Sequence, residues 1–231
     1  MKFAAKDTIK NRNKKSKADI RESIIIQLAT SAATGSLGKL DPKLLTAENL
    51  SLPNSFGLNA LHCAATHAKL HAVPKELLIE EILLAWDHNG QTALHYAAEN
   101  NEIKWLPQSI ITKENLMLQD AEGNSVYHYL ANYGTLNSIP RTLIDKEAVL
   151  TENDFKKDVL DMAIHSEARE ADPNLNQCQI LLQCLDNKTL KEMIKKNPRD
   201  KLRIKSCNDQ LSRNSVIKQI KKEERDMSFE I

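Results

Sequence analysis

The stretch Gly90-Gln91-Thr92-Ala93-Leu94-His95-Tyr96-Ala97-Ala98 decides the fold, because two other parts of the chain repeat it. Residues 57–65 read GLNALHCAA, and residues 123–131 read GNSVYHYLA. Each step is 33 residues, and prolines keep the same register at Pro74, Pro107, Pro140 and Pro173. A fixed period of this length indicates a repeat architecture, in which neighbouring units bury apolar faces that one unit cannot bury alone.

The pattern continues outward with decay on both sides. Downstream, Asp161 stands in the histidine position and Asn153 in the position of the turn acid. Upstream, residues 28–32 fill the preceding slot without the histidine. Terminal units lose such signatures because each has only one neighbour. We therefore predict about five units over residues 23–173, of which the outer two are degenerate caps.

Each unit carries its own local signals. Residues 87–90 and 120–123 are tight-turn sequences that end in glycine, and Thr92 or Ser125 then stands where a helix N-cap is expected. A helix follows over residues 93–98, rich in alanine. A second apolar stretch predicts the other helix of the pair, shortened or kinked by proline and with an extra turn near Thr-x-Glu-Asn. It contains Ile103, Trp105, Leu106, Ile110 and Ile111.

These residues resemble ankyrin repeats. Residues 87–98 match the family pattern D-x-x-G-x-T-P-L-H-x-A-A, with Ala93 in place of the proline. The resemblance implies an all-α solenoid of stacked helix pairs with the turns projecting as fingers. It also implies that His62, His95 and His128 bond between adjacent turns. The usual L-L-x-x-G-A is absent after the second helix, a variant style that we associate with bacterial repeat proteins, including ones delivered into host cells.

In the family that the chain resembles, partners meet the finger tips and the exposed edge of the first helix. Among the residues at that register, Phe56 and Tyr133 stand out, because exposed aromatic side chains often anchor interfaces. The alternative is that both pack against a neighbouring unit. We expect Trp86 and Trp105 to pack in the core or between units. The predicted contact residues are Phe56, His67, His88, Asn89, Gln91, Glu99, Asn100, Glu122, Asn124, Asn132 and Tyr133.

The sequence offers little sign of chemistry, so we expect no enzyme, no cofactor and no small-molecule substrate. No phosphate loop, nucleophile elbow or dinucleotide fingerprint is present. His67 and His71 are four residues apart, but no third metal ligand is apparent. The four cysteines form no CxxC pair and are expected to be ordinary thiols. An enzyme would need its chemistry in residues 174–231, which hold no recognisable set of acid, base and nucleophile.

Charge divides the chain into three parts. Residues 1–22 hold eight Lys/Arg against three acids, and residues 188–231 hold thirteen against seven. Between them lies an acidic body. We predict a basic N-terminal extension at 1–22, repeats at 23–173, and a helical C-terminal cap with a basic tail at 174–231. The basic ends could dock on the acidic body or stay solvated.

The leading prediction is a module, or scaffold, that binds a protein partner, with an effector acting in a host cell as a narrower possibility. The alternative is an adaptor that binds nucleic acid or an acidic membrane through its basic ends, which would be sensitive to salt. Residues 1–6 show no secretory signal, and no apolar run is long enough to span a membrane. We therefore expect a cytoplasmic protein.

Overall fold

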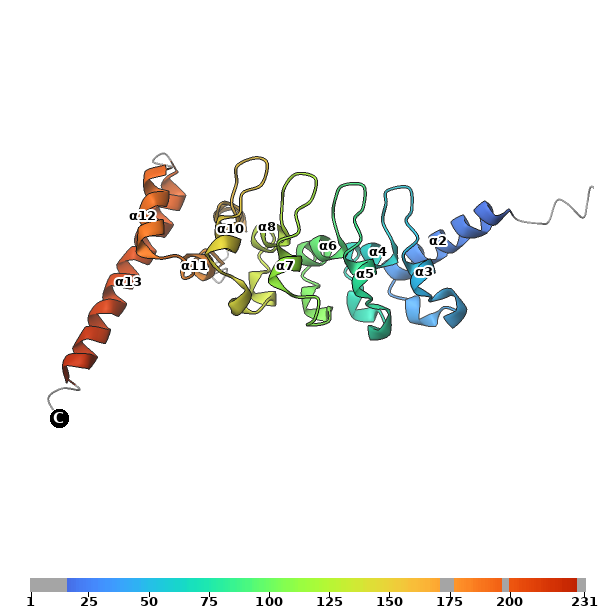
Figure 1. The fold of residues 1–231 in the computed structure, drawn as a ribbon, viewed down its shortest axis with the longest axis horizontal. Helices are drawn as coiled ribbons and strands as arrows, with labels where there is room; N and C mark the ends of the chain where they lie inside the picture. Colours follow the sequence, from blue (N-terminus) through green and yellow to red (C-terminus); the bar gives the residue numbers. More distant parts are fainter. Residues whose placement is uncertain (1–15, 171–176, 197–199, 228–231) are drawn as a thin grey trace, which may run out of the picture. The chain divides into compact units, whose positions relative to one another are not determined.

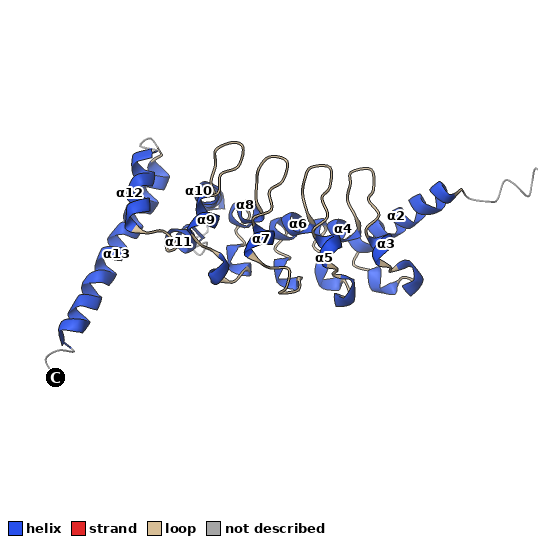
Figure 2. Cartoon of the chain, in the orientation of Figure 1, coloured by secondary structure: helices blue, strands red, loops and turns tan. Residues whose placement is uncertain are grey.

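The computed structural model describes residues 16–170, 177–196 and 200–227 of the chain. Within these residues the secondary structure is helical and no β-strand occurs; Figure 2 shows only helices and the loops that join them. The chain divides into two compact units, residues 1–107 and residues 108–231. We describe each unit by itself, and the domain boundaries expected at residues 22 and 173 stay a prediction.

Unit 1 consists of short helices joined by loops (Figure 1). Its α-helices are α2 (Lys17–Ala33), α3 (Ala47–Leu50), α4 (Ala60–Thr66), α5 (Glu80–Leu83) and α6 (Ala93–Glu99). Its 3₁₀ helices are Leu37–Lys39, Pro42–Leu44, Leu70–Ala72, Lys75–Leu77 and Ile103–Trp105. Helix α4 packs against both α2 and α6, so these three first helices form the centre of the unit.

Unit 2 begins with the same pattern and ends in longer helices. Its α-helices are α7 (Lys113–Leu116), α8 (Val126–Asn132), α9 (Lys146–Leu150), α10 (Val159–Glu170), α11 (Gln177–Leu182), α12 (Asn187–Lys196) and α13 (Lys201–Met227). Its 3₁₀ helices are Leu136–Ser138 and Arg141–Leu143. Helix α10 packs against α8 and α11, and α12 packs against α13. The predicted C-terminal helices are therefore present, and α13 also contacts α10.

Alanine makes the close packing of the first helices possible. Ala64, Ala65, Ala97 and Ala98 are fully buried, and a small side chain lets neighbouring helices approach closely. Leucine supplies most of the remaining volume, and the largest buried side chains are mostly leucines. The helices α2, α4, α6, α8 and α10 occupy the predicted register, one in each repeat. This confirms an all-α fold of about five repeats.

The second helix of the repeat is shortened around its proline, as predicted. Residues 103–111 do not form one helix: Ile103–Trp105 is a 3₁₀ turn, and α7 begins only at Lys113. Proline lacks the amide hydrogen that a helix interior needs, so the chain forms separate turns around Pro107. The extra turn expected at Thr-x-Glu-Asn is confirmed, because the Thr112 hydroxyl caps α7 by accepting from the amide of Asn115 at 3.2 Å.

The two tryptophans lie outside the core. Trp86 is 50% exposed and Trp105 is 47% exposed, so neither lies in the core, one of the two places that the sequence predicted. Trp105 lies beside His71, with 5.9 Å between ring centroids, and the Lys104 ammonium lies 5.8 Å from its ring. Because His71 belongs to the preceding repeat, Trp105 packs between repeats, the other place that the sequence predicted.

Candidate functional site

Four loops, which we call fingers, precede helices α4, α6, α8 and α10 and project from one edge of their units (Figure 1). They comprise residues 54–58, 87–91, 120–124 and 153–157. The first residue closes each finger: Asp87 Oδ1 accepts from the amides of Asn89 and Gln91, both at 2.8 Å. Asn54, Asp120 and Asn153 make the same pair of bonds.

In the last finger Asn153 stands in the position of the turn acid and still closes the turn. An amide oxygen accepts from backbone amides as a carboxylate oxygen does, so the loop keeps its shape. The second oxygen of aspartate has a further partner in the middle fingers: it accepts from Tyr96 at 2.6 Å in one and from Tyr129 at 2.7 Å in the other. Fingers that begin with asparagine have no hydroxyl at that register; the residues there are Cys63 and Met162.

Buried histidines connect helix α4 to the finger 87–91 and helix α8 to the finger 153–157. His62 Nδ1 accepts from the amide of Asn59 at 3.3 Å, and Nε2 donates to the carbonyl of Gln91 at 3.3 Å. His128 does the same in unit 2, with bonds of 3.0 and 3.1 Å to its partners Ser125 and Lys157. These bonds require the neutral tautomer. Burial lowers the pKa of His62 and His128 in spite of hydrogen bonds that raise it, and the predicted role of both is confirmed.

Neighbouring fingers within a unit are also bonded at their tips. The amide of His88 donates to the carbonyl of Phe56 at 3.2 Å, and in unit 2 the amide of Asp154 donates to the carbonyl of Glu122 at 3.0 Å. Gly123 has a φ of 76°, and a Cβ there would lie 2.9 Å from the nitrogen of Asp154. Glycine therefore permits both the turn and the close approach of the next finger.

Most of the predicted finger residues present their side chains to solvent. Phe56 is 69% exposed, so its alternative reading as a packed residue is wrong. His88, Asn89 and Glu122 are exposed, and Gln91 is half-buried. Asn124 differs: it is 7% exposed, and its Oδ1 accepts from Asn153 at 2.6 Å. Asn124 therefore supports two fingers from inside rather than forming their surface.

The remaining predicted residues lie at the ends of the first helices. Thus His67, Asn100 and Tyr133 are the C-cap residues of α4, α6 and α8. His67 and Asn100 bond back to their own helices, to the carbonyls of Cys63 and Tyr96. Tyr133 is 40% exposed. Glu99 and Asn132 are half-buried one residue earlier in α6 and α8.

Several of these residues meet in unit 2. A hollow of about 220 Å³ lies between the finger 120–124 and the helices α8 and α10. It brings together four predicted contact residues of this unit, and it adds His128, Tyr129 and Met162, which sequence reasoning left out. Its predicted members are Glu122, Asn124, Asn132 and Tyr133.

Sequence reasoning also missed an exposed aromatic side chain. Phe155 is 65% exposed at the tip of the last finger. It follows Phe56 by three periods of 33 residues, so the register could have found it. The signal is weak there, because Lys156 replaces the glycine that marks the other fingers.

The histidine pair does not form a metal site. Helix α4 ends at Thr66, so His67 and His71 do not share a helix. The carboxylate of Glu102 lies 3.7 Å from His71 Nδ1. No group of three potential metal-ligating side chains occurs in the part of the chain that the structure describes.

A buried ion pair attaches the C-terminal helices to the last repeat. Arg203 of α13 binds Asp161, in the histidine position, and Asp158, the residue before α10. The guanidinium NH1 also lies 3.1 Å from Asp158 Oδ1. Burial alone would lower the pKa of Arg203, but the hydrogen bonds and charges of the two carboxylates raise it. Part of the basic tail therefore docks on the acidic repeats, one of the alternatives that the sequence left open.

Other basic side chains of the tail remain at the surface. Lys196 pairs with Glu152 at 3.0 Å, and Lys188 lies 4.0 Å from Glu192. Lys191, Lys195, Lys201 and Lys205 are exposed. Most of the basic N-terminal extension lies outside the described residues.

Stacked first helices with bonded fingers define a helical repeat protein. The ankyrin repeat family, with three copies of its repeat, matches residues 31–109, about a third of the chain. The chain therefore contains ankyrin repeats, and the resemblance seen in its sequence is confirmed. Such repeats are generally protein–protein interaction modules. A comparison with curated proteins found no match. In the described residues, every helix is too short or too polar to cross a bilayer.

Proposed function

We propose that the chain is a protein-binding module whose contact surface consists of the fingers and the ends of the first helices. The observation that carries this proposal is that each repeat separates the positions that build the scaffold from the positions that form the surface. Positions that build the scaffold are buried and bonded, as His62 and His128 are. Positions at the finger tips are exposed and differ in character from finger to finger: Phe56, Asn89, Glu122 and Phe155.

The scaffold supports binding because it holds this surface in place. Backbone bonds join neighbouring tips within each unit, and one side chain closes each loop. A preformed surface loses little conformational entropy when a partner binds, so more of the contact energy contributes to affinity. Phe56 and Phe155 present large apolar areas that suit interface anchors.

The proposed surface keeps ten of the eleven predicted contact residues. It leaves out Asn124, which supports it from below, and adds Phe155. We propose a module that is not an enzyme and acts in a cytoplasm. The narrower role of a bacterial effector in a host cell stays a prediction from the repeat style.

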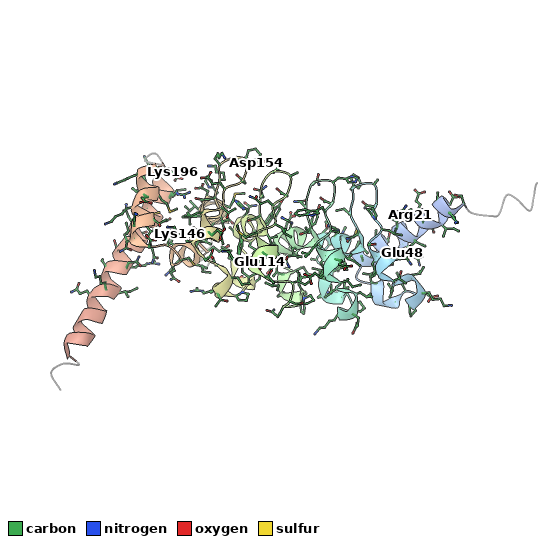
Figure 3. All side chains as sticks on the ribbon, in the orientation of Figure 1. Arg21, Glu48, Glu114, Lys146, Asp154 and Lys196 are labelled. Carbon is green, nitrogen blue, oxygen red and sulfur yellow. The ribbon has the colours of Figure 1, made fainter. Side chains whose placement is uncertain are left out.

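Site-specific photo-crosslinking tests the proposal. The full chain carries p-benzoylphenylalanine at position 56, 89 or 122 and is irradiated in lysate at about 0.05 M and about 0.5 M salt. Matched controls carry the same residue at positions 48 and 142, which are exposed in 3₁₀ turns or short second helices of units 1 and 2; Figure 3 labels Glu48 on α3.

We expect one protein to crosslink from the finger positions at both salt concentrations and not from the controls. The alternative function, an adaptor for nucleic acid or acidic membranes, predicts another outcome. Crosslinks would then be as frequent at positions 48 and 142 as at the fingers, and binding of nucleic acid or anionic vesicles would disappear at high salt.

A further inference from the structure

The hollow of unit 2 has the size of a single side chain. Its volume is about 220 Å³, below the roughly 300–1,000 Å³ of pockets that hold small-molecule ligands. Finger 120–124 and helices α8 and α10 surround it. Its lining residues are Glu122, Asn124, His128, Tyr129, Asn132, Tyr133 and Met162.

Two parallel aromatic rings form one side of this hollow. Tyr129 and Tyr133 stack with 6.3 Å between ring centroids and 9° between ring planes. Tyr129 is held in place because its hydroxyl donates to Asp120 at 2.7 Å. Tyr133 keeps 40% of its surface exposed. The face of an aromatic ring attracts cations, and a planar guanidinium can stack on it.

The charge of the hollow is negative. Glu122 is exposed at its rim, and its Oε2 accepts from Asn124 Nδ2 at 3.3 Å. Asn124 is itself fixed by the bond from Asn153 to its Oδ1, so a buried amide chain orients the carboxylate. Burial lowers the pKa of His128, and both of its ring nitrogens are bonded, so this ring adds no positive charge.

The carboxylate and the two stacked tyrosines are specific to this repeat and are not a general feature of the repeats. At the same register two periods earlier, in unit 1, Glu122 corresponds to Phe56 and the two tyrosines correspond to Cys63 and His67. That position therefore has no carboxylate and no pair of stacked tyrosines. The hollow of unit 2 combines features that select a cation.

We propose that this hollow receives an arginine side chain of the protein partner, with the guanidinium stacked on Tyr133 and paired with Glu122. The inference rests on the proposed function, because it names the chemistry by which the finger surface selects its partner. Arginine suits the site better than lysine, since its flat guanidinium both stacks and forms directed hydrogen bonds to a carboxylate.

The test is a titration of the full chain with N-acetyl-L-arginine methylamide, followed by amide chemical shifts in NMR. We expect shifts concentrated at residues 120–133, with weaker effects for the lysine analogue and none for the glutamate analogue. The variants Glu122→Gln and Tyr133→Leu should each weaken binding by about five- to tenfold. Asp154→Asn is the matched control, because Asp154 lies on the adjacent finger (Figure 3) and is not among the residues that line the hollow.

Three results would overturn the inference: no shifts in the hollow, equal shifts with the glutamate analogue, or equal weakening by Asp154→Asn. The last would mean that net charge attracts the probe and the hollow does not. If these occur while positions 56 and 89 still crosslink a partner, only the arginine site fails. If the finger positions capture no protein, the proposed function itself fails.

Discussion

Two joints within unit 2 perform the same task with different chemistry. Between α8 and the last finger, the neutral ring of His128 links Ser125 to Lys157 by hydrogen bonds. After α10, Asp161 takes the histidine position and pairs with Arg203 of α13. The difference shows that where the repeat pattern ends, an ion pair replaces the hydrogen bonds of the neutral histidine as the link to the next element. The aspartate at position 161 thus has a structural role, although it reads as a lost signature in the sequence.

The largest effect should come from breaking the charged joint. Arg203→Met leaves Asp158 and Asp161 buried without a counter-ion, and loss of one partner of a buried pair costs about 3–5 kcal/mol. We expect this loss in the free energy of unfolding, measured by urea denaturation. The control variant combines Arg203→Met with Asp158→Ser and Asp161→His, which restores the residue pattern of the inner repeats. A triple variant as unstable as the single one would contradict this account of the ion pair.

Removing the hydrogen bonds of His128 should lower the free energy of unfolding by a smaller amount. His128→Ala leaves the buried amide of Ser125 and the carbonyl of Lys157 without their partner, and we expect a loss of about 1–3 kcal/mol in the same assay. His67→Ala removes an exposed ring and should change stability by less than about 0.5 kcal/mol. Equal losses for the two variants would show that His128 is no joint.

The glycine position sharpens the comparison between inner and last repeats. Gly123→Lys forces a side chain into a positive φ and against Asp154, which should cost about 1–2 kcal/mol or more. Lys156, with φ 59°, already bears such strain in the last finger. Lys156→Gly should therefore stabilise the chain by up to about 1 kcal/mol. Destabilisation by Lys156→Gly would contradict the shared geometry of the two fingers.

The smallest effect we expect is that of mild acid on the histidine joints. Burial lowers the pKa of His62 and His128, so the unfolded chain binds protons more readily than the folded one. Stability is then fully present above the unfolded pKa of about 6.5 and falls as the pH drops below it. Urea denaturation at about pH 7 and about pH 5 measures the change, and His128→Asn should reduce it. A chain that is more stable at pH 5 than at pH 7 would contradict the claim that these histidines are neutral in the folded state.

The sequence predicts the repeats well because local chemistry sets them. Glycine, the helix caps and the histidine recur at fixed spacing, and each is recognisable in one unit. The second helices were harder, because residues 103–111 are apolar enough for a helix and only the backbone around Pro107 shows the separate turns. The ion pair of Arg203 was invisible, since its partners Asp158 and Asp161 lie more than 40 residues away in the chain.

The sequence predicted which positions belong to the contact surface but not how deeply each side chain is buried. Phe56 and Tyr133 were placed correctly at exposed positions by counting residues from the histidine. Asn124 was misjudged, because burial of a finger residue depends on Asn153 of the next repeat. The hollow combines residues of two helices and a finger, and no single stretch of sequence reveals it.

Hydrogen–deuterium exchange of the full chain tests the central claim most directly. It is measured with and without the partner protein that photo-crosslinking identifies. The account predicts slower exchange at the fingers 54–58, 87–91, 120–124 and 153–157 and at the ends of α4, α6 and α8. Exchange in α12 and α13 should stay unchanged. Slower exchange confined to α12 and α13, with the fingers unaffected, would contradict the claim that the finger surface binds the partner.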